Sequence, residues 1–294
     1  MTSTADPSPT LADARETRHN LAWLLGVVVL AGATTLPMWR EVAARVVGPP
    51  GVLPREVYAK GDPNVTFDHG PLDAVLATHV DADGFVDYGA IARDPAPLDE
   101  YLATLATARF ETLGRDAKLA FLINAYNAHS IRRIAAHWPL ETIDALPVEA
   151  ADGMVRCELF DSSLTLAQLE HDWIRAKFVE PRSHFALHRA SLGGPPLLNA
   201  AYTGIRLEDQ LEEQVRRTYG SHRWFRFDAV TGRLDLSQIH LRYATDFQHA
   251  CGSLLNFVRR QDGTVDRFLK AGRTVQTEWL PWDRTLDSLA NRPY

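Results

Sequence analysis

An uncharged apolar segment near the N-terminus constrains the architecture of this chain more than any other feature. Residues 21–38, from Leu21 to Met38, contain no charged side chain. As a helix, this segment would be about 27 Å long, which matches the hydrocarbon core of a bilayer. Trp23 and Trp39 would lie near its ends, where indole rings favour the membrane interface. The segment therefore predicts a single transmembrane anchor over residues 21–39.

A cleaved signal peptide is the first alternative for the same segment. Residues 21–30 are apolar, and Ala31, Gly32 and Ala33 follow as small residues typical of a cleavage site. The polar stretch before the segment is long for a signal peptide and carries acidic side chains, which favours the uncleaved anchor. A buried helix of the folded core is a further alternative. The arginines after the segment slightly favour a cytoplasmic domain.

The rest of the chain divides into a tail, a linker and one domain. Residues 1–20 are polar and rich in Pro, Ser and Thr, which predicts a disordered tail. Residues 40–67 contain clustered glycine and proline and indicate a linker, so the domain is expected to span residues 68–294. Its composition, with 46% hydrophobic and 23% charged residues, is that of a folded protein. The net charge of −6 gives no reason to expect a nucleic-acid partner.

Hydrophobic periodicity predicts an α+β fold, a single mostly helical domain around a small sheet. Asp116 is expected to cap a long helix over residues 117–136. Thr165 and Gln168 form a capping-box pattern at the start of a helix that runs to about residue 178. A charged amphipathic helix is expected over residues 206–219, and Ser237 is expected to cap a later one. The expected strands are residues 84–88, 154–160 and 184–190, with a hairpin over 224–236.

The two cysteines, Cys157 and Cys251, stand at no motif spacing. This spacing excludes zinc ribbons, CxxC redox sites and multiple-disulfide frameworks. In an exported domain the two could form one bridge, a possibility that the linear sequence leaves open.

Several stretches together resemble the bacterial family known as domain of unknown function 547. The stretches are GFVDY (84–88), KLAFLINAYNAHSI (118–131), LTLAQLEHDWIR (164–175), PRSHFALHRASLGGPPLLNAAY (181–202), LDLSQIHLRYATDF (234–247) and EWLPWDRTLDSL (278–289). The resemblance covers roughly residues 68–290 and implies one domain of unassigned activity. Because members often follow an export or anchor segment, it favours an extracytoplasmic, periplasmic domain, either anchored in the membrane or cleaved and released.

The chain departs from this family at a pair of cysteines. Where the family typically has Cys-Ala-Ser, two variable residues and Cys-Pro, this chain has Arg189 at the first cysteine position and Gly194 at the second. The resemblance therefore implies the family framework without its thiols. Arg189 adds a permanent positive charge, which predicts either an acidic partner such as Glu170 or an anionic ligand.

Polar side chains within apolar elements are the first candidates for function. Asn124 and Asn127 share one helix face, and two amides at this spacing either fix a backbone turn or hold a polar ligand. Glu170 and His171 place a carboxylate beside an imidazole, the combination that a general base requires. Adjacent helical side chains diverge, however, so an ordinary buried pair that meets another element is the alternative.

The remaining candidates lie around the expected strand at 184–190. On a strand, His184 and His188 would share a face about 13 Å apart, too far to bind one metal ion together. His171 and His184 with Asp246 would be a conceivable metal site, but no metal or cofactor is expected. Ser191 stands at the start of a glycine-containing turn, either as an exposed nucleophile or as a serine that bonds to its own loop.

Three functional hypotheses follow. The first is a membrane-tethered domain whose pocket binds a small molecule or a protein partner without thiol chemistry. Its expected ligand-binding residues are Asn124, Asn127, Arg189, Gly193 and Gly194. The second is a hydrolase or transferase with candidate catalytic residues His171, His184, Glu170 and Ser191. The third is a structural scaffold for an envelope complex.

Overall fold

The computed structural model describes residues 51–58 and 65–292. The predicted tail, the apolar segment 21–38 and most of the predicted linker lie outside these residues. No helix among the described residues combines the length and the apolar character needed to cross a membrane. Residues 51–58 lie against the domain, because the amides of Arg55 and Val57 donate to the carbonyls of Ala176 and Lys177, each at 3.1 Å.

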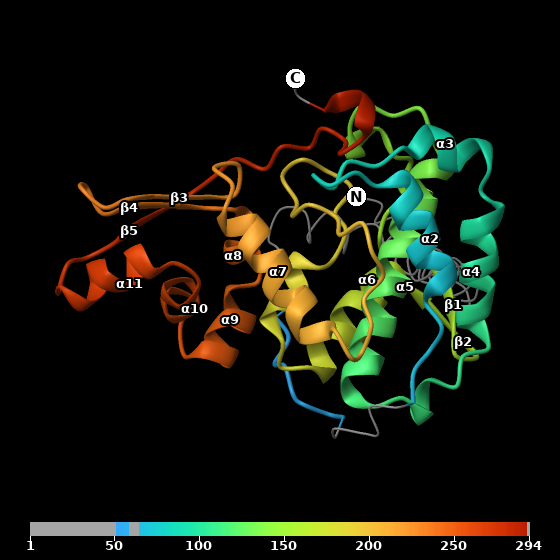
Figure 1. Cartoon of the computed structure of the whole chain (residues 1–294), viewed down its shortest axis with the longest axis horizontal. Coiled ribbons are helices and arrows are strands. Elements are labelled where there is room, and N and C mark those ends of the chain that lie inside the picture. Colours follow the sequence, from blue (N-terminus) through green and yellow to red (C-terminus); the bar gives the residue numbers. More distant parts are fainter. Residues whose placement is uncertain (1–50, 59–64, 293–294) are drawn as a thin grey trace, which may run out of the picture. The chain divides into compact units, whose positions relative to one another are not determined.

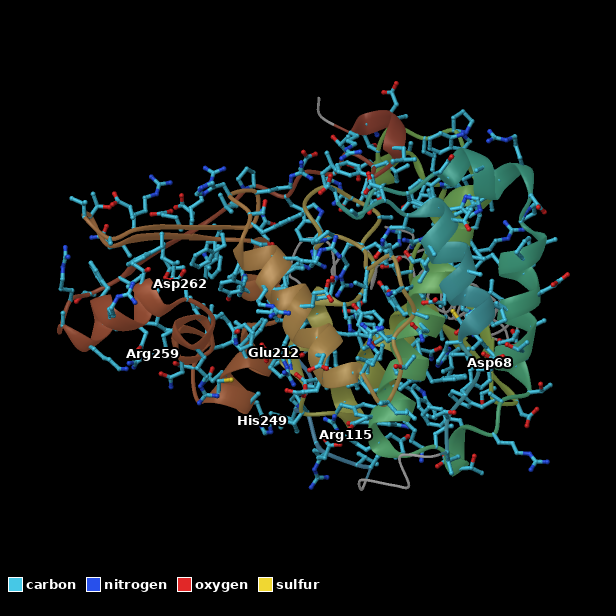
Figure 2. The ribbon with its side chains drawn as sticks, viewed as in Figure 1. Asp68, Arg115, Glu212, His249, Arg259 and Asp262 are labelled. Atoms are coloured by element: carbon cyan, nitrogen blue, oxygen red, sulfur yellow. The ribbon has the colours of Figure 1, made fainter. Side chains whose placement is uncertain are left out.

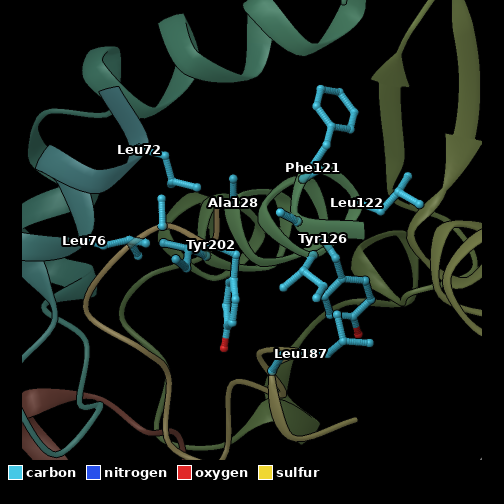
Figure 3. Packing of buried hydrophobic residues seen from close by; sticks show 14 of the residues in the cluster. Leu72, Leu76, Phe121, Leu122, Tyr126, Ala128, Leu187 and Tyr202 are labelled. Carbon is cyan, nitrogen blue, oxygen red and sulfur yellow. The ribbon is translucent and has the colours of Figure 1, made fainter. Parts of the chain in front are cut away.

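Helix α5 (Arg115–Ala136), drawn in green in Figure 1, contributes many side chains to the largest hydrophobic cluster. Every residue from Ala117 to Ala128 is buried, so the helix contacts other elements on all sides rather than along one stripe. Figure 3 shows Phe121, Leu122, Tyr126 and Ala128 of α5 among the side chains of this cluster. The long helix predicted here is confirmed.

The start of α5 differs from the expectation. Gly114, not Asp116, is the residue that caps the helix. Asp116 lies within the first turn, where its carboxylate pairs at 2.8 Å with the guanidinium of Arg115, the side chain labelled in Figure 2. An acidic residue in the first turn stabilises a helix through the macrodipole without capping it.

Small elements surround α5 in Figure 1. Helices α3 (Tyr88–Arg93) and α4 (Ala96–Ala106) contact α5, and α2 (Gly70–His79) contacts both of them. Strands β1 (Arg156–Leu159) and β2 (Ser162–Thr165) form an antiparallel hairpin, and β1 contacts α4. Single 3₁₀ turns are η1 (Phe110–Thr112), η2 (Ile143–Ala145), η3 (Val148–Ala150) and η6 (Leu289–Asn291).

The predicted capping box is present. The Thr165 hydroxyl accepts from the Gln168 amide at 3.1 Å, and the Gln168 side chain accepts from the Thr165 amide at 2.8 Å. It begins α6 (Leu166–Gln168), which continues as a π-helical segment, η4 (Leu169–Arg175). π-helical turns are rare in proteins overall, but those that occur are often found at functional sites. This one carries Glu170 and His171.

The C-terminal half contains a second small sheet. Strands β3 (Phe225–Asp228) and β4 (Arg233–Leu236) form the predicted hairpin, and β5 (Gln276–Trp279) pairs with β4 in parallel. The helices of this half are α7 (Leu207–Tyr219), α8 (Gln238–Arg242), α9 (Ala244–Cys251), α10 (Leu254–Gln261) and α11 (Gly263–Lys270). Ser237 caps α8 as expected. Cys251 is the last residue of α9.

The prediction of a strand at residues 184–190 is wrong. Pro181 begins a 3₁₀ turn, η5 (Pro181–Phe185), and turns and irregular chain follow to residue 206. Side-chain amides from α5 and α7, rather than a neighbouring strand, bond to this buried backbone. His184 and His188 therefore do not share a strand face, which was the basis of the expected 13 Å spacing.

The strand predicted at residues 84–88 is reduced to a single residue. Val86 forms isolated bridges with Val80 and Ser288. The Asp87 carboxylate accepts from the Ala90 amide at 2.8 Å, which begins α3 at Tyr88. The α+β class is confirmed. The described residues contain two small sheets, and the main cluster surrounds a helix rather than a sheet.

Candidate functional site

The irregular segment at residues 185–203 is held from one side by the two asparagines of α5. The Asn127 amide donates to the Ala186 carbonyl at 2.9 Å and accepts from the His188 amide at 2.8 Å. Asn124 bonds in the same way to the carbonyl and the amide of Tyr202, at 2.8 and 2.9 Å. Of the two roles that the sequence left open, these hydrogen bonds correspond to the fixing of backbone.

Helix α7 holds the same segment with two buried glutamines that the sequence analysis missed. Gln210 donates to the Ala201 carbonyl at 2.8 Å and accepts from the Thr203 amide at 3.0 Å. Gln214 donates to the carbonyls of Phe185 and Pro196. Two amides four residues apart on the inner face of an amphipathic helix were the available signal.

Strained backbone separates Arg189 from Ser191. Ala190, between them, has φ of 52°, a left-handed conformation that residues with a Cβ rarely adopt. Arg189 reaches the aromatic and acidic groups beside α5, whereas Ser191 lines a pocket on a different set of residues. A Cβ at Gly194 would lie 2.6 Å from the Arg189 Cβ, so only glycine allows this close approach.

Arg189 forms a bidentate ion pair with Glu170 of η4. Its two terminal nitrogens lie 2.7 and 3.0 Å from the carboxylate oxygens, and the Arg189 side chain is only 10% exposed. The hydroxyl of Tyr243 donates to Glu170 at 2.6 Å, and Arg189 donates to the hydroxyl of Tyr126 at 3.2 Å. The predicted acidic partner of Arg189 is therefore confirmed.

The electrostatics of this pair keep both groups charged. Burial would raise the pKa of Glu170, but Arg189, His171 and the Tyr243 hydrogen bond hold that pKa well below its ordinary value. Burial lowers and Glu170 raises the pKa of Arg189, and the net change is upward. The pair thus stays ionised in the folded protein at neutral pH, and neither group can serve as a proton donor there.

A second ion pair lies beside the first. Arg175 of η4 donates through two nitrogens to Asp246 of α9, at 2.8 and 3.0 Å, and His184 Nε2 lies 2.9 Å from the same carboxylate. The His184 ring stacks on Tyr243 with 3.8 Å between ring centroids. His171 Nδ1 lies 3.2 Å from Arg175. The residues considered for a metal site thus meet around an arginine, and the described residues contain no group of three or more metal-ligating side chains.

His188 belongs to a separate cluster. Its Nε2 lies 3.0 Å from the Asp287 carboxylate and 3.0 Å from the Tyr88 hydroxyl, which itself donates to Asp287 at 2.7 Å. His188 and Tyr88 are fully buried, and Asp287 is 7% exposed. Tyr88 and Asp287 lie in stretches that carried the family resemblance, although the sequence analysis assigned no role to either residue.

Ser191 lies in neither cluster. Its hydroxyl is buried and has no hydrogen-bond partner among the described residues, so it does not contact a histidine as a nucleophile would. It lines a small cavity, which we call the Ser191 pocket. The lining residues are Asp83, Gly84, Phe85, Ser191, Leu192, Gly194, Pro195, Pro196, Arg223, Trp224 and Asp287.

The two glycines of the loop use their amides within the chain. The Gly193 amide donates to the Asp283 carbonyl at 2.8 Å, and the Gly194 amide donates to the Ser191 carbonyl at 2.9 Å. Their N–H groups are therefore engaged in shaping the loop.

Neither cysteine is an activated thiol. Cys157 lies in β1 and is fully buried, and burial raises the pKa of its thiol to about 12. Burial also raises the pKa of the half-buried Cys251. Both cysteines are free in the structure, and a nucleophilic thiolate would require the opposite shift.

The structure brings together five residues that the sequence had indicated, Glu170, His171, His184, Arg189 and Asp246. It adds Arg175, whose charge Asp246 balances, and Tyr243, which donates a hydrogen bond to Glu170. The amides of Asn124 and Asn127 bond to the loop that carries Arg189. Ser191 faces a different pocket.

Comparison with known protein families gives one match. Residues 110–217 match the family described as "Protein of unknown function, DUF547", a range that runs from η1 to α7 and includes Asn124, Glu170, Arg189 and Ser191. The suspected resemblance is thus confirmed over this range. No curated protein and no solved structure matches the chain.

Proposed function

We propose that this chain is a membrane-tethered domain that binds a small ligand or a partner segment at the Ser191 pocket and performs no thiol chemistry. The ion pair between Arg189 and Glu170 carries the proposal. At the position where the resemblance implies a cysteine, the chain has a guanidinium that a buried carboxylate already neutralises. This group has no nucleophilic atom and no free charge for a ligand.

The arrangement of the histidines favours binding over the hydrolase alternative. His184 and His171 contact Asp246 and Arg175, and His188 contacts Asp287 and Tyr88. None of them forms a hydrogen bond with Ser191, whose hydroxyl has no hydrogen-bond partner among the described residues. A serine nucleophile needs a base within hydrogen-bond reach. The open pocket beside the loop is a place for recognition rather than for this chemistry.

A ligand screen with a blocked pocket tests the proposal. Leu192 lines the pocket and is half-buried, so Leu192→Trp should fill it. Compounds that raise the melting temperature of the full-length chain should lose this effect in Leu192→Trp and keep it in the control Leu241→Trp, at an exposed position of α8. A ligand at a hundredfold excess over its Kd stabilises by about 2.7 kcal/mol. Compounds that stabilise both variants equally would show that the pocket is not the binding site.

The tether is proposed from the sequence of residues 21–38 and has its own test. The full-length chain should stay with membranes after a carbonate wash. Replacing Val28 and Leu30 with arginine should release it, because an arginine near the centre of a spanning helix costs about 2.5–3.5 kcal/mol. Release of the unsubstituted chain would contradict the tether, and a mature N-terminus at Thr34 would indicate a cleaved signal peptide instead.

A further inference from the structure

The Ser191 pocket contains two buried hydrogen-bonding groups without partners. Ser191 is 1% exposed and Trp224 is 8% exposed, and both residues line the pocket. Neither the Ser191 hydroxyl nor the Trp224 indole N–H has a hydrogen-bond partner among the described residues. Leaving a buried polar group unpaired costs about 1–3 kcal/mol, so a ligand that accepts these hydrogen bonds would recover that cost.

A cation lies at the same pocket. Arg223 is exposed, and its guanidinium lies over the rings of Trp224 and Phe85, at 5.4 and 5.9 Å from their centroids. No carboxylate pairs with Arg223 within the part of the chain that the structure describes. A stacked guanidinium keeps its N–H edge free for a planar anion.

Two carboxylates also line the pocket, and both have partners. Asp83 pairs with Arg292 at 2.5 Å. Asp287 accepts from the Tyr88 hydroxyl at 2.7 Å, and its second oxygen lies 3.0 Å from His188 Nε2. These contacts reduce the repulsion that an anion would meet. Among the described residues that line the pocket, Arg223 is the cation that forms no ion pair.

The remaining walls are apolar, and the space is small. Phe85, Leu192, Pro195 and Pro196 contribute carbon surface, and the empty volume is about 220 Å³ including the open side. Much of this volume is open solvent, and the enclosed part has room for about one water-sized group. A carboxylate can therefore enter while the rest of a ligand stays at the open side.

We infer that the Ser191 pocket binds small carboxylic acids. One carboxylate oxygen accepts from Arg223, and the other accepts from the Trp224 indole N–H and the Ser191 hydroxyl. The short apolar part of the acid lies against the two prolines. This inference rests on the proposed binding function and specifies its ligand class.

The indole N–H of Trp224 provides a direct measurement. The full-length chain in detergent micelles, labelled with ¹⁵N-tryptophan, is titrated with N-acetylglycine and with its neutral analogue N-acetylglycinamide. Trp224→Phe identifies the signal. The acid should shift this signal with a Kd on the order of 1 mM, and the amide should bind at least tenfold more weakly.

Two matched arginine variants locate the charge. Arg223→Ala should weaken the acid at least tenfold and remove its advantage over the amide, and Ser191→Ala should weaken it about threefold. Arg226→Ala, at another exposed arginine nearby that does not line the pocket, should change nothing. If propionate binds as tightly as N-acetylglycine, the ligand is a free small acid. If propionate binds more weakly, the ligand is the C-terminal carboxylate of a peptide. Both results support a carboxylate ligand.

Equal shifts from the acid and the amide would overturn the inference, as would acid binding that Arg223→Ala leaves unchanged. No shift with either probe would overturn it too. The proposed function fails on a different result, namely stabilising compounds that are indifferent to Leu192→Trp. The two failures are therefore distinguishable.

Discussion

The side chain of Arg189 requires a carboxylate because a buried guanidinium cannot lose its charge. Glu170 supplies this carboxylate and accepts two hydrogen bonds from Arg189. The Tyr243 hydroxyl donates a third hydrogen bond to Glu170. Sequence predicted this partner from charge alone. Sequence did not predict the second pair, Arg175 with Asp246. The two residues lie 71 positions apart, and Asp246 was considered only as a metal ligand.

Removing one member of the Arg189–Glu170 pair should destabilise the fold strongly. Arg189→Met leaves Glu170 buried with Tyr243 as its main donor, and we expect a loss of about 3–5 kcal/mol in the free energy of unfolding. Glu170→Gln alone leaves the guanidinium uncompensated. The double variant should lose less than the sum, by about 1–3 kcal/mol, in urea unfolding. Strict additivity would mean that the two side chains do not interact.

At the scale of elements, the sequence predicted helices better than strands. Residues 117–136 and 206–219 have long apolar periodicity, and α5 and α7 are found there. Residues 184–190 have the apolar composition of a buried strand. Their backbone, however, forms hydrogen bonds with side chains of α5 and α7. No property of the segment itself indicates that its hydrogen-bond partners are amides far away in the chain.

The side-chain amides of Asn124, Asn127, Gln210 and Gln214, which we call the amide bracket, hold this segment. Removing one of these amides should therefore lower the stability of the fold. Asn127→Ala leaves the Ala186 carbonyl and the His188 amide buried without partners, and we expect a loss of about 1–3 kcal/mol in the free energy of unfolding. The exposed Asn199 is the control, and Asn199→Ala should change stability by less than about 0.5 kcal/mol. Equal effects of the two substitutions would show that the bracket does not hold the loop.

For the whole molecule, buried histidines make stability depend on pH. Burial lowers the pKa of His69, His129 and His240 from the ordinary 6.5 to about 4. Below pH 6.5 the unfolded chain therefore binds protons that the folded chain does not. The free energy of unfolding should fall as the pH decreases from 6.5 towards 4, by up to about 1.4 kcal/mol per pH unit for each histidine.

Unfolding between pH 6.5 and 5 isolates this effect, because few carboxylates titrate there. His240→Gln should reduce the slope, whereas His222→Gln, at an exposed position, should leave it unchanged. A free energy of unfolding that stays constant over this range would contradict the account.

The absence of thiol chemistry is the central claim for the whole molecule, and the alkylation rate of the native chain tests it most directly. Cys157 is buried with a pKa of about 12, and burial raises the pKa of Cys251. With iodoacetamide at pH 7, intact-mass measurements should find Cys157 unmodified and Cys251 modified more slowly than free glutathione. Either cysteine reacting faster than glutathione in the folded protein would contradict the claim.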